Sequence, residues 1–429
     1  MTTITLPAPS TPTTPNRADR SSPKDLPLTT LALLVALAAT LVVGGLDDDS
    51  SGSAQVLGLD DVTEAIGADA AWSAGVTGEG IRVALLDSGI SPVGPLEGRV
   101  VGSGGDAVGH GTHLAGIVAA VAPGSTLVDV NVAGAEGEPS VQRFLESLRA
   151  IVGGEIVADV VVIAAELEAT PLQQAAYAEL VREVTEAGTV IVAAAGNRST
   201  AGAGLDWTAT PPEVIAVGGA EQRGGWQVPA WSATGTSVRL PDLVAPGASV
   251  VSVLAPDSAA ATDPTAVRVG EEMIRGSGTS QAAAVVAGAV ALLAEADPQL
   301  TTAGARVRLT SSAQPMPEAR PTAQGAGLLD LRSLFALGDG APTSSWTGNS
   351  WTGNSWTGNS WTGNSWTGNS WTGNSWTGNS WTGNSWTGNS WTGNSWTGNS
   401  WTGNSWTGNS WTGNSWTGNS WTGNSWTGN

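Results

Sequence analysis

The sequence contains no cysteine, and it is poor in basic residues. Without cysteine there can be no disulfide framework, thiolate metal site or thiol nucleophile, so the fold must be stabilised by burial alone. Of 429 residues, 37 are acidic and 17 are Lys or Arg, and Lys24 is the only lysine. Nucleic-acid binding needs a basic face, so this balance argues against a nucleic-acid partner and fits a soluble acidic surface.

Histidine is nearly as scarce, and both histidines lie in one short segment, Gly-His110-Gly-Thr-His113. A reaction that needs an imidazole base has no other place to find one. The spacing of the two rings could suit a metal, but no further ligand cluster accompanies them, so we expect no metal site. His110 is therefore the candidate base. We expect His113 to be a packed, hydrogen-bonded helix residue.

The N-terminal region has the pattern of an export segment. Residues 1–27 are rich in Thr, Pro and Ser and are expected to form a disordered tail. Residues 28–46 are uncharged and largely apolar, with basic residues before them and three aspartates after them. Both a cleaved signal peptide and an uncleaved membrane anchor fit, because no good cleavage site closes the segment and its length approaches ~20 residues. The rest of the chain is therefore expected to be secreted or held at the cell surface, with 47–55 as a linker.

Apolar strands alternate with helices through the central part of the chain, which we assign to one domain at residues 56–337. Such alternation predicts an α/β fold with a mostly parallel sheet that is covered on both faces. In such sheets the functional site lies at the carboxyl ends of the strands, where Asp87 and Asn197 are expected. The strands are predicted at 81–86, 126–132, 158–165 and 189–195, and the helices at 109–122, 139–152 and 172–187.

One face of the predicted helix at 139–152 is apolar. The apolar residues on this face recur at helical spacing. They are Val141, Phe144, Leu145, Leu148, Ile151 and Val152.

A long, nearly uncharged run after Gly276-Ser-Gly-Thr-Ser280-Gln predicts a buried helix with Ser280 in its first turn. The N–H groups of a first turn point outward and favour negative charge, which suits a nucleophile. Taken alone, the segment fits equally well an ordinary buried helix capped by Thr279 or Ser280.

Four segments together resemble, in type and order, the signature segments of the subtilisin-like serine proteases. They are Val-Ala-Leu-Leu-Asp87-Ser-Gly, Gly-His110-Gly-Thr-His-Leu-Ala-Gly, Ala-Ala-Ala-Gly-Asn197 and Ser-Gly-Thr-Ser280-Gln-Ala. The resemblance covers roughly residues 56–337. It implies a three-layer αβα subtilisin-like fold and a serine endopeptidase.

The chemistry implied by the resemblance fits the residue types. A serine hydroxyl is a weak nucleophile and needs a base, which His110 would supply, while Asp87 would orient the ring. The tetrahedral oxyanion would accept hydrogen bonds from the Asn197 side chain and the Ser280 N–H, and the reaction would pass through an acyl-enzyme on Ser280.

Several positions depart from the family pattern. Ala164, Ala165 and Glu166 stand where the family has Ser-Leu-Gly on the strand that binds substrate. Asp206 stands where the family often has a small residue at the base of the primary specificity pocket. The two carboxylates favour a basic residue before the scissile bond, and an acidic surface patch is the alternative reading.

The polar segment that usually follows the family's aspartate is missing after Asp87. Calcium is therefore suggested by the resemblance alone, and no calcium site is assigned. No cofactor is expected. The interval between Leu46 and Asp87 is too short for the family's pro-domain. The domain is therefore expected to fold unaided or with help from another chain.

A linker at 338–344 leads to residues 345–429, which repeat Ser-Trp-Thr-Gly-Asn without interruption. With a period of five, neither a strand nor an α-helix would gather the tryptophans on one face. The Gly-Asn pair in each unit favours turns. We therefore expect a turn-based spiral or a flexible tail. Tryptophan faces stack on sugar rings, which indicates contact with a cell wall or glycan. A low-complexity stalk is the alternative.

The sequence therefore predicts an exported or surface-tethered serine endopeptidase that acts on proteins or peptides. The competing interpretation is a binding protein. In this interpretation the protease fold no longer binds substrate productively because of Glu166, and the repeat acts as an adhesin.

Overall fold

The computed structural model describes residues 54–335 with short gaps at 103, 135–136, 166 and 199–203, and it describes the backbone of most of the repeat from 345 onward. The predicted tail, export segment and most of the first linker lie outside the described residues, as does the linker at 338–344.

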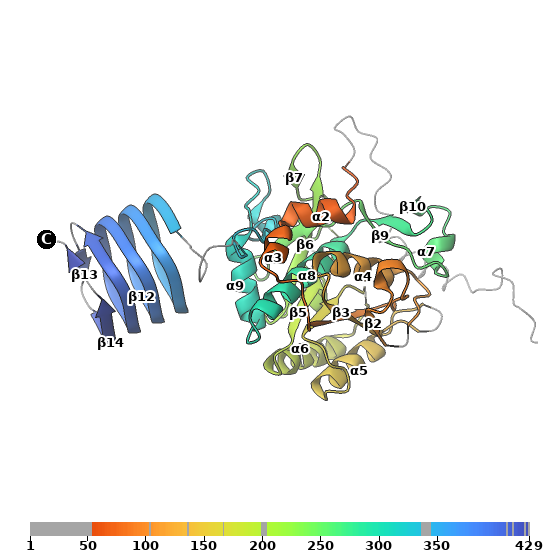
Figure 1. The fold of residues 1–429 in the computed structure, drawn as a ribbon. Coiled ribbons are helices and arrows are strands. Elements are labelled where there is room, and N and C mark those ends of the chain that lie inside the picture. The colour runs from red at the N-terminus through yellow and green to blue at the C-terminus, as the bar shows by residue number, and fades with distance from the viewer. Residues whose placement is uncertain are drawn as a thin grey trace, which may run out of the picture.

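The domain is built on one large, mostly parallel sheet (Figure 1). Its strands run in the order β2-β3-β1-β4-β5-β6-β7, and β8 also pairs with β6. Only β7 is antiparallel to its neighbour. Along this order the strands are β2 (Val100–Val101), β3 (Thr126–Asn131), β1 (Arg82–Asp87), β4 (Val160–Ile163), β5 (Val190–Ala194), β6 (Ile215–Gln222) and β7 (Trp226–Gln227). The strand β8 (Leu243–Pro246) lies beside β6.

Helices cover both faces of this sheet, so the three-layer αβα architecture is confirmed (Figure 1). Alternate residues of β1 divide between two cores: Val83 and Leu85 face one, and Ala84 and Leu86 face the other. The first core contains α2 (Leu59–Ile66), α4 (His110–Val121) and α8 (Thr279–Ala296). The second contains α5 (Val141–Val152) and α6 (Pro171–Glu186).

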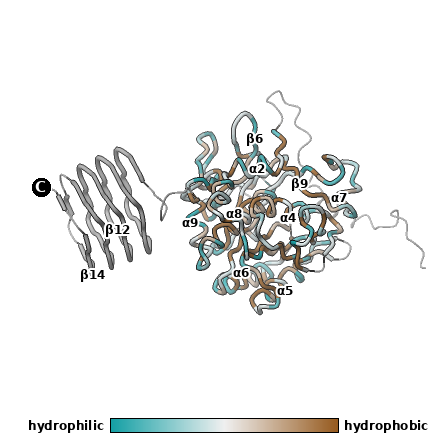
Figure 2. Tube along the Cα trace, in the orientation of Figure 1, coloured by the Kyte–Doolittle hydropathy of each residue, from teal (hydrophilic) through white to brown (hydrophobic). Residues whose placement is uncertain are grey.

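The helices α4 and α8 lie in the interior and approach each other closely because small residues line their contact. A Cβ at Gly288 of α8 would lie 2.6 Å from the Cβ of Val121 of α4, so only glycine fits there. Hydrophobic residues gather in this interior, while the peripheral loops are more hydrophilic (Figure 2). Among the described residues, α8 alone is long and apolar enough to cross a membrane, but it is a buried core helix.

The helix α5 begins and ends close to its predicted limits. Ser140 caps it by accepting a hydrogen bond from the N–H of Arg143. Four residues of its apolar face, from Phe144 to Ile151, are buried. Val152 is not, because it closes the last turn and is 38% exposed.

A small antiparallel sheet precedes the Ser280 segment, in the order β10-β11-β9. Its strands are β9 (Val250–Val253), β10 (Val267–Val269) and β11 (Met273–Gly276). Because β11 ends only a few residues before α8, this sheet fixes where the helix begins. The remaining short elements are α3 (Asp69–Ser73), η2 (Gly94–Leu96), η3 (Trp207–Ala209), α7 (Ala259–Thr262), α9 (Thr302–Ser312) and α10 (Pro321–Gln324).

The backbone of the repeat forms parallel strands. The long β12 (Ser345–Gly408) pairs with β13 (Trp411–Gly413), β14 (Trp416–Gly423) and β15 (Trp426–Thr427). Each paired Cα lies 20 residues from its partner, as in Trp391 opposite Trp411. A shift of 20 residues is four pentapeptides, so identical residues stand opposite each other in the paired strands. Figure 1 shows the repeat as a stack of ribbons.

Candidate active site

Three neighbouring parallel strands end at one edge of the sheet, and a predicted site residue lies at each end. β1 ends at Asp87, β4 is followed by Ala164, and β5 leads to Asn197. Leu86 pairs with Ile163, so the residues that follow them stand side by side on strands ~4.8 Å apart. The sheet thus gathers residues that are far apart in the sequence.

Asp87 and His110 form a buried pair. The Nδ1 atom of His110 lies 2.8 Å from Oδ1 of Asp87, and the two side chains are 2% and 3% exposed. A carboxylate can only accept this hydrogen bond, so it assigns the proton of the neutral ring to Nδ1 and leaves Nε2 as the basic nitrogen.

A second buried carboxylate, Asp106, connects the end of β1 to the first turn of α4. Its Oδ1 accepts hydrogen bonds from the Ser88 hydroxyl at 2.9 Å and from the N–H groups of Val108 and Gly109. Its Oδ2 accepts from the N–H and hydroxyl of Thr112, both at 2.8 Å. Asp106 therefore positions the helix that begins with the candidate base. The sequence interpretation missed it, although a lone aspartate four residues before that histidine was the available signal.

Ser280 lies in the first turn of α8, as predicted. Its side chain is buried, and its hydroxyl donates a hydrogen bond to the carbonyl oxygen of Ala164 at 3.3 Å. That carbonyl follows β4, the strand beside β1. The serine hydroxyl therefore reaches the sheet edge at which the Asp87–His110 pair lies.

The amide of Asn197 is oriented by Thr279, the first residue of α8. Its Oδ1 accepts from the Thr279 N–H at 2.8 Å and from the Thr279 hydroxyl at 3.1 Å. The same hydroxyl accepts from the N–H of Gly196 at 3.0 Å. Because Oδ1 is occupied by these two donors, Nδ2 is the atom that remains for another acceptor. The orienting part played by Thr279 was not anticipated from the sequence.

Of the predicted substrate-binding residues, Ala164 and Ala165 directly follow β4 and are buried, at 7% and 6% exposure. Glu166 lies outside the described residues.

Asp206 lies beside the loop that carries Asn197. A Cβ built on Gly196 would lie 3.3 Å from the Cβ of Asp206. The carboxylate caps η3 by accepting from the N–H and hydroxyl of Thr208, at 3.0 and 2.8 Å. Burial raises the pKa of Asp206 above its ordinary value. This aspartate is therefore partly desolvated and already has local hydrogen-bond partners.

His113 is packed, but it is not hydrogen-bonded as expected. The ring is 0% exposed, and neither nitrogen has a partner among the described residues. Burial, together with the neighbouring His110, lowers the pKa of His113 to about 3. The tertiary environment offers this imidazole no acceptor, which the local helical pattern could not reveal.

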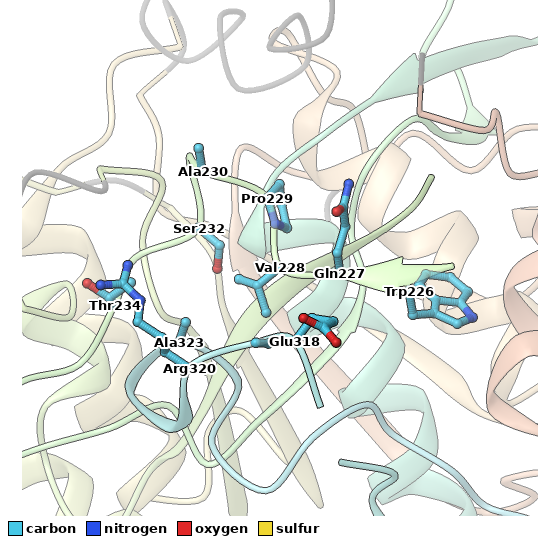
Figure 3. A pocket seen from close by; sticks show the side chains of 11 residues that line it. Trp226, Gln227, Val228, Pro229, Ala230, Ser232, Thr234, Glu318, Arg320 and Ala323 are labelled. Carbon is cyan, nitrogen blue, oxygen red and sulfur yellow. The ribbon is translucent and has the colours of Figure 1, made fainter. Parts of the chain in front are cut away.

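A pocket of about 230 Å³ lies elsewhere, between the β7 region and the segment around residues 318–323 (Figure 3). Trp226, Gln227, Glu318 and Arg320 contribute to its lining, and none of the predicted site residues does. Within the described ranges, no group of three or more His, Asp or Glu side chains is arranged to hold a metal ion.

Comparisons with known proteins show the family of the chain and agree with its fold. The sequence model of the subtilase family matches residues 78–327. Serine protease AprX of Bacillus subtilis (strain 168) is 28% identical over 313 residues, which cover 64% of this chain and 71% of AprX. Subtilisin Savinase of Lederbergia lenta is 33% identical over 264 residues, which cover 57% of this chain and 88% of Savinase.

A solved structure supports the fold alone. Fervidolysin from Fervidobacterium pennivorans, described as a keratinolytic enzyme related to subtilisin, superimposes with a TM-score of 0.52 at 24% sequence identity. The match covers 63% of this chain and 44% of that larger chain.

His113 should make stability depend on pH. Its pKa is about 3 when folded and 6.5 when exposed, so below pH 6.5 the unfolded state binds more protons. The free energy of unfolding therefore does not depend on the protonation of His113 above pH 6.5, and it decreases as the pH falls from 6.5 toward 3. At pH 5 the loss is about 2 kcal/mol, at ~1.4 kcal/mol per pH unit. Unfolding of Ser280→Ala with and without His113→Gln should show a steeper loss between pH 7 and 5 when His113 is present. Parallel curves would contradict this.

Proposed function

The chain belongs to the subtilase family and is a serine-type endopeptidase, and we propose that it cleaves proteins or peptides outside the cytoplasm through Asp87, His110 and Ser280. One observation carries the assignment of these residues. The buried 2.8 Å hydrogen bond between His110 and Asp87 lies at the sheet edge that Ser280 reaches through the Ala164 carbonyl. The uncharged segment at 28–46 supports export, either as a signal peptide or as a membrane anchor.

In the proposed reaction, the Oγ atom of Ser280 attacks the substrate carbonyl carbon while its proton passes to Nε2 of His110. The oxygen that becomes negative accepts hydrogen bonds from the Ser280 N–H and from Nδ2 of Asn197. The carbon–nitrogen bond then breaks, and the leaving amine takes the proton from His110. Water attacks the acyl-enzyme by the same route and releases the acid. Loss of one oxyanion donor typically costs ~100- to 1,000-fold in kcat, a range that comes from a subtilisin rather than from this chain.

We further propose that the cleft prefers a basic residue before the scissile bond. The Cβ of Asp206 lies against Gly196, the residue before Asn197, so Asp206 is a neighbour of the loop that carries the proposed oxyanion donor. A partly buried carboxylate attracts a substrate cation more strongly than an exposed one. Glu166 would add to this attraction from the substrate-binding strand.

The repeat supports a second function, attachment to a cell wall or glycan. Its tryptophans recur every five residues, and the backbone register places identical residues above one another. Tryptophan rings stack on the flat faces of sugars, so a segment with one tryptophan in every five residues suits a glycan ligand.

Labelling of the full chain with a fluorophosphonate probe tests the catalytic assignment. The wild-type chain should react covalently, and Ser280→Ala should abolish labelling because the nucleophile is gone. His110→Ala should reduce labelling to near background because the hydroxyl loses its base. Circular dichroism of each variant controls for folding. A folded wild-type chain that does not react would favour the binding-protein interpretation, with the repeat as its functional part.

Peptides that differ only in the residue before the cleaved bond test the specificity. We expect kcat/KM for Arg to exceed that for Leu and Phe by about tenfold or more, since ~1.4 kcal/mol of charge attraction gives that ratio. Asp206→Asn should reduce the preference. Glu183→Gln, on the exposed face of α6, removes the same charge elsewhere and should not. Equal cleavage of the three peptides by the wild-type chain would eliminate the proposed pocket.

Sedimentation with insoluble glycans tests the repeat. Ser280→Ala chains with and without residues 345–429 should be mixed with peptidoglycan, cellulose and chitin. Only the longer chain should sediment with at least one of them, because only it carries the repeated tryptophans. If both chains stay in solution, or both sediment equally, the repeat is a stalk and not a glycan-binding element.

A further inference from the structure

Gln281 follows the candidate nucleophile and has an unusual environment. The residue is 0% exposed, yet neither Oε1 nor Nε2 has a hydrogen-bond partner among the described residues. Buried amides in proteins are nearly always hydrogen-bonded, because leaving them unpaired is costly. A completely unpaired glutamine beside a reacting serine therefore needs an explanation.

The Gln281 amide approaches the same glycine as the Asn197 amide. Its Oε1 lies 3.0 Å from the position that a Cβ on Gly278 would occupy, and Nδ2 of Asn197 lies 3.2 Å from the same position. The two amides thus flank one glycine immediately before the first turn of α8. Asn197 is the proposed side-chain donor to the oxyanion, so a second amide borders the place where negative charge develops.

The part of α8 that follows Gln281 has no side chain that could form a hydrogen bond with this amide. Residues 282–294 are alanine, valine, glycine and leucine, without a polar side chain. The amides of Asn197 and Gln281 also differ in one respect. The oxygen of Asn197 is engaged by Thr279, whereas both ends of the Gln281 amide remain unpaired. A half-turn about the last side-chain bond exchanges its oxygen and nitrogen at little cost, so Gln281 can present donor N–H groups to Gly278.

We propose that Gln281 is a catalytic residue that donates a hydrogen bond to the oxyanion of the tetrahedral intermediate. The inference rests on the proposed function. When Ser280 attacks, the carbonyl π electrons move to oxygen and the serine proton moves to His110. The new charge is then shared among the Ser280 N–H, the Asn197 amide and the Gln281 Nε2–H. The Gln281 hydrogen bond exists only while the oxygen carries charge, so it lowers the barrier without strengthening ground-state binding.

The test compares Gln281→Met with the wild-type full chain, because methionine has similar length and no N–H group. We expect kcat on a peptide anilide to fall about 10- to 100-fold with KM changed less than twofold, as for an interaction made only in the transition state. A peptide aldehyde forms a tetrahedral adduct with the serine, whereas the matching alcohol does not. Gln281→Met should therefore weaken inhibition by the aldehyde about tenfold or more and leave inhibition by the alcohol unchanged.

Thermal stability separates this function from a packing role. Since the amide is unpaired in the free enzyme, Gln281→Met should leave Tm unchanged or raise it while kcat falls. Gln324→Met is the matched control. Its buried amide is fully hydrogen-bonded to the backbone of Met316 and Ala319, away from the site. That variant should lower Tm and keep kcat.

Gln281→Glu provides an independent variant if methionine disturbs folding. The glutamate has the same shape, but its charge would repel the oxyanion, so kcat should fall further than with methionine. The loss should diminish at lower pH, where a protonated carboxyl can donate. Unchanged kcat in both Gln281 variants, or equal weakening of aldehyde and alcohol, overturns this inference alone. A folded wild-type chain without hydrolysis or labelling overturns the proposed function, and this inference with it.

Discussion

The parallel pairing of β1, β4 and β5 is the constraint on which the site depends. Parallel strands all end at one edge, so the turns that follow them converge there whatever their separation in sequence. Asp87 ends the first of these strands, and α4 begins with His110 within the crossover that follows it. The carboxylate and the imidazole are therefore held by one strand–helix unit. Ser280 lies in α8, nearly 200 residues after Asp87 in the sequence. Only tertiary packing can bring it to the same edge.

That packing depends on close approach between backbones. A Cβ on Gly111 would lie 2.2 Å from the carbonyl oxygen of Gly89, so a side chain there would push the start of α4 away from the turn after Asp87. A Cβ on Gly288 would lie 2.6 Å from the Cβ of Val121 in α4, which is also too close. The small residues of α4 and α8 are thus a geometric requirement of the site. They allow the base and the nucleophile to come from two helices that pack against one sheet.

The elements of the fold could be predicted from local pattern, because buried parallel strands are short apolar runs and helices show their period. The strand that ends at Asp87 and the helix that begins at His110 were predicted to within a residue. Val152 continues the apolar spacing of α5, but it is 38% exposed because the end of the helix lies outside the packed layer. Asp106 could not be recognised in this way. Its partners come from the turn after β1 and from the start of α4. From sequence alone, an aspartate in a glycine-rich loop cannot be distinguished from an ordinary turn residue.

Buried polar groups near the site fall into two classes that residue type does not distinguish. Asp106 and the oxygen of Asn197 accept several hydrogen bonds each, so they fix the geometry and add to stability. The side chains of His113 and Gln281 have no hydrogen-bond partner among the described residues and cost stability. A core of this size can tolerate that cost. Selection for stability alone would replace an unpaired glutamine with an apolar residue, so its presence beside Ser280 is best explained by a bond formed only during the reaction.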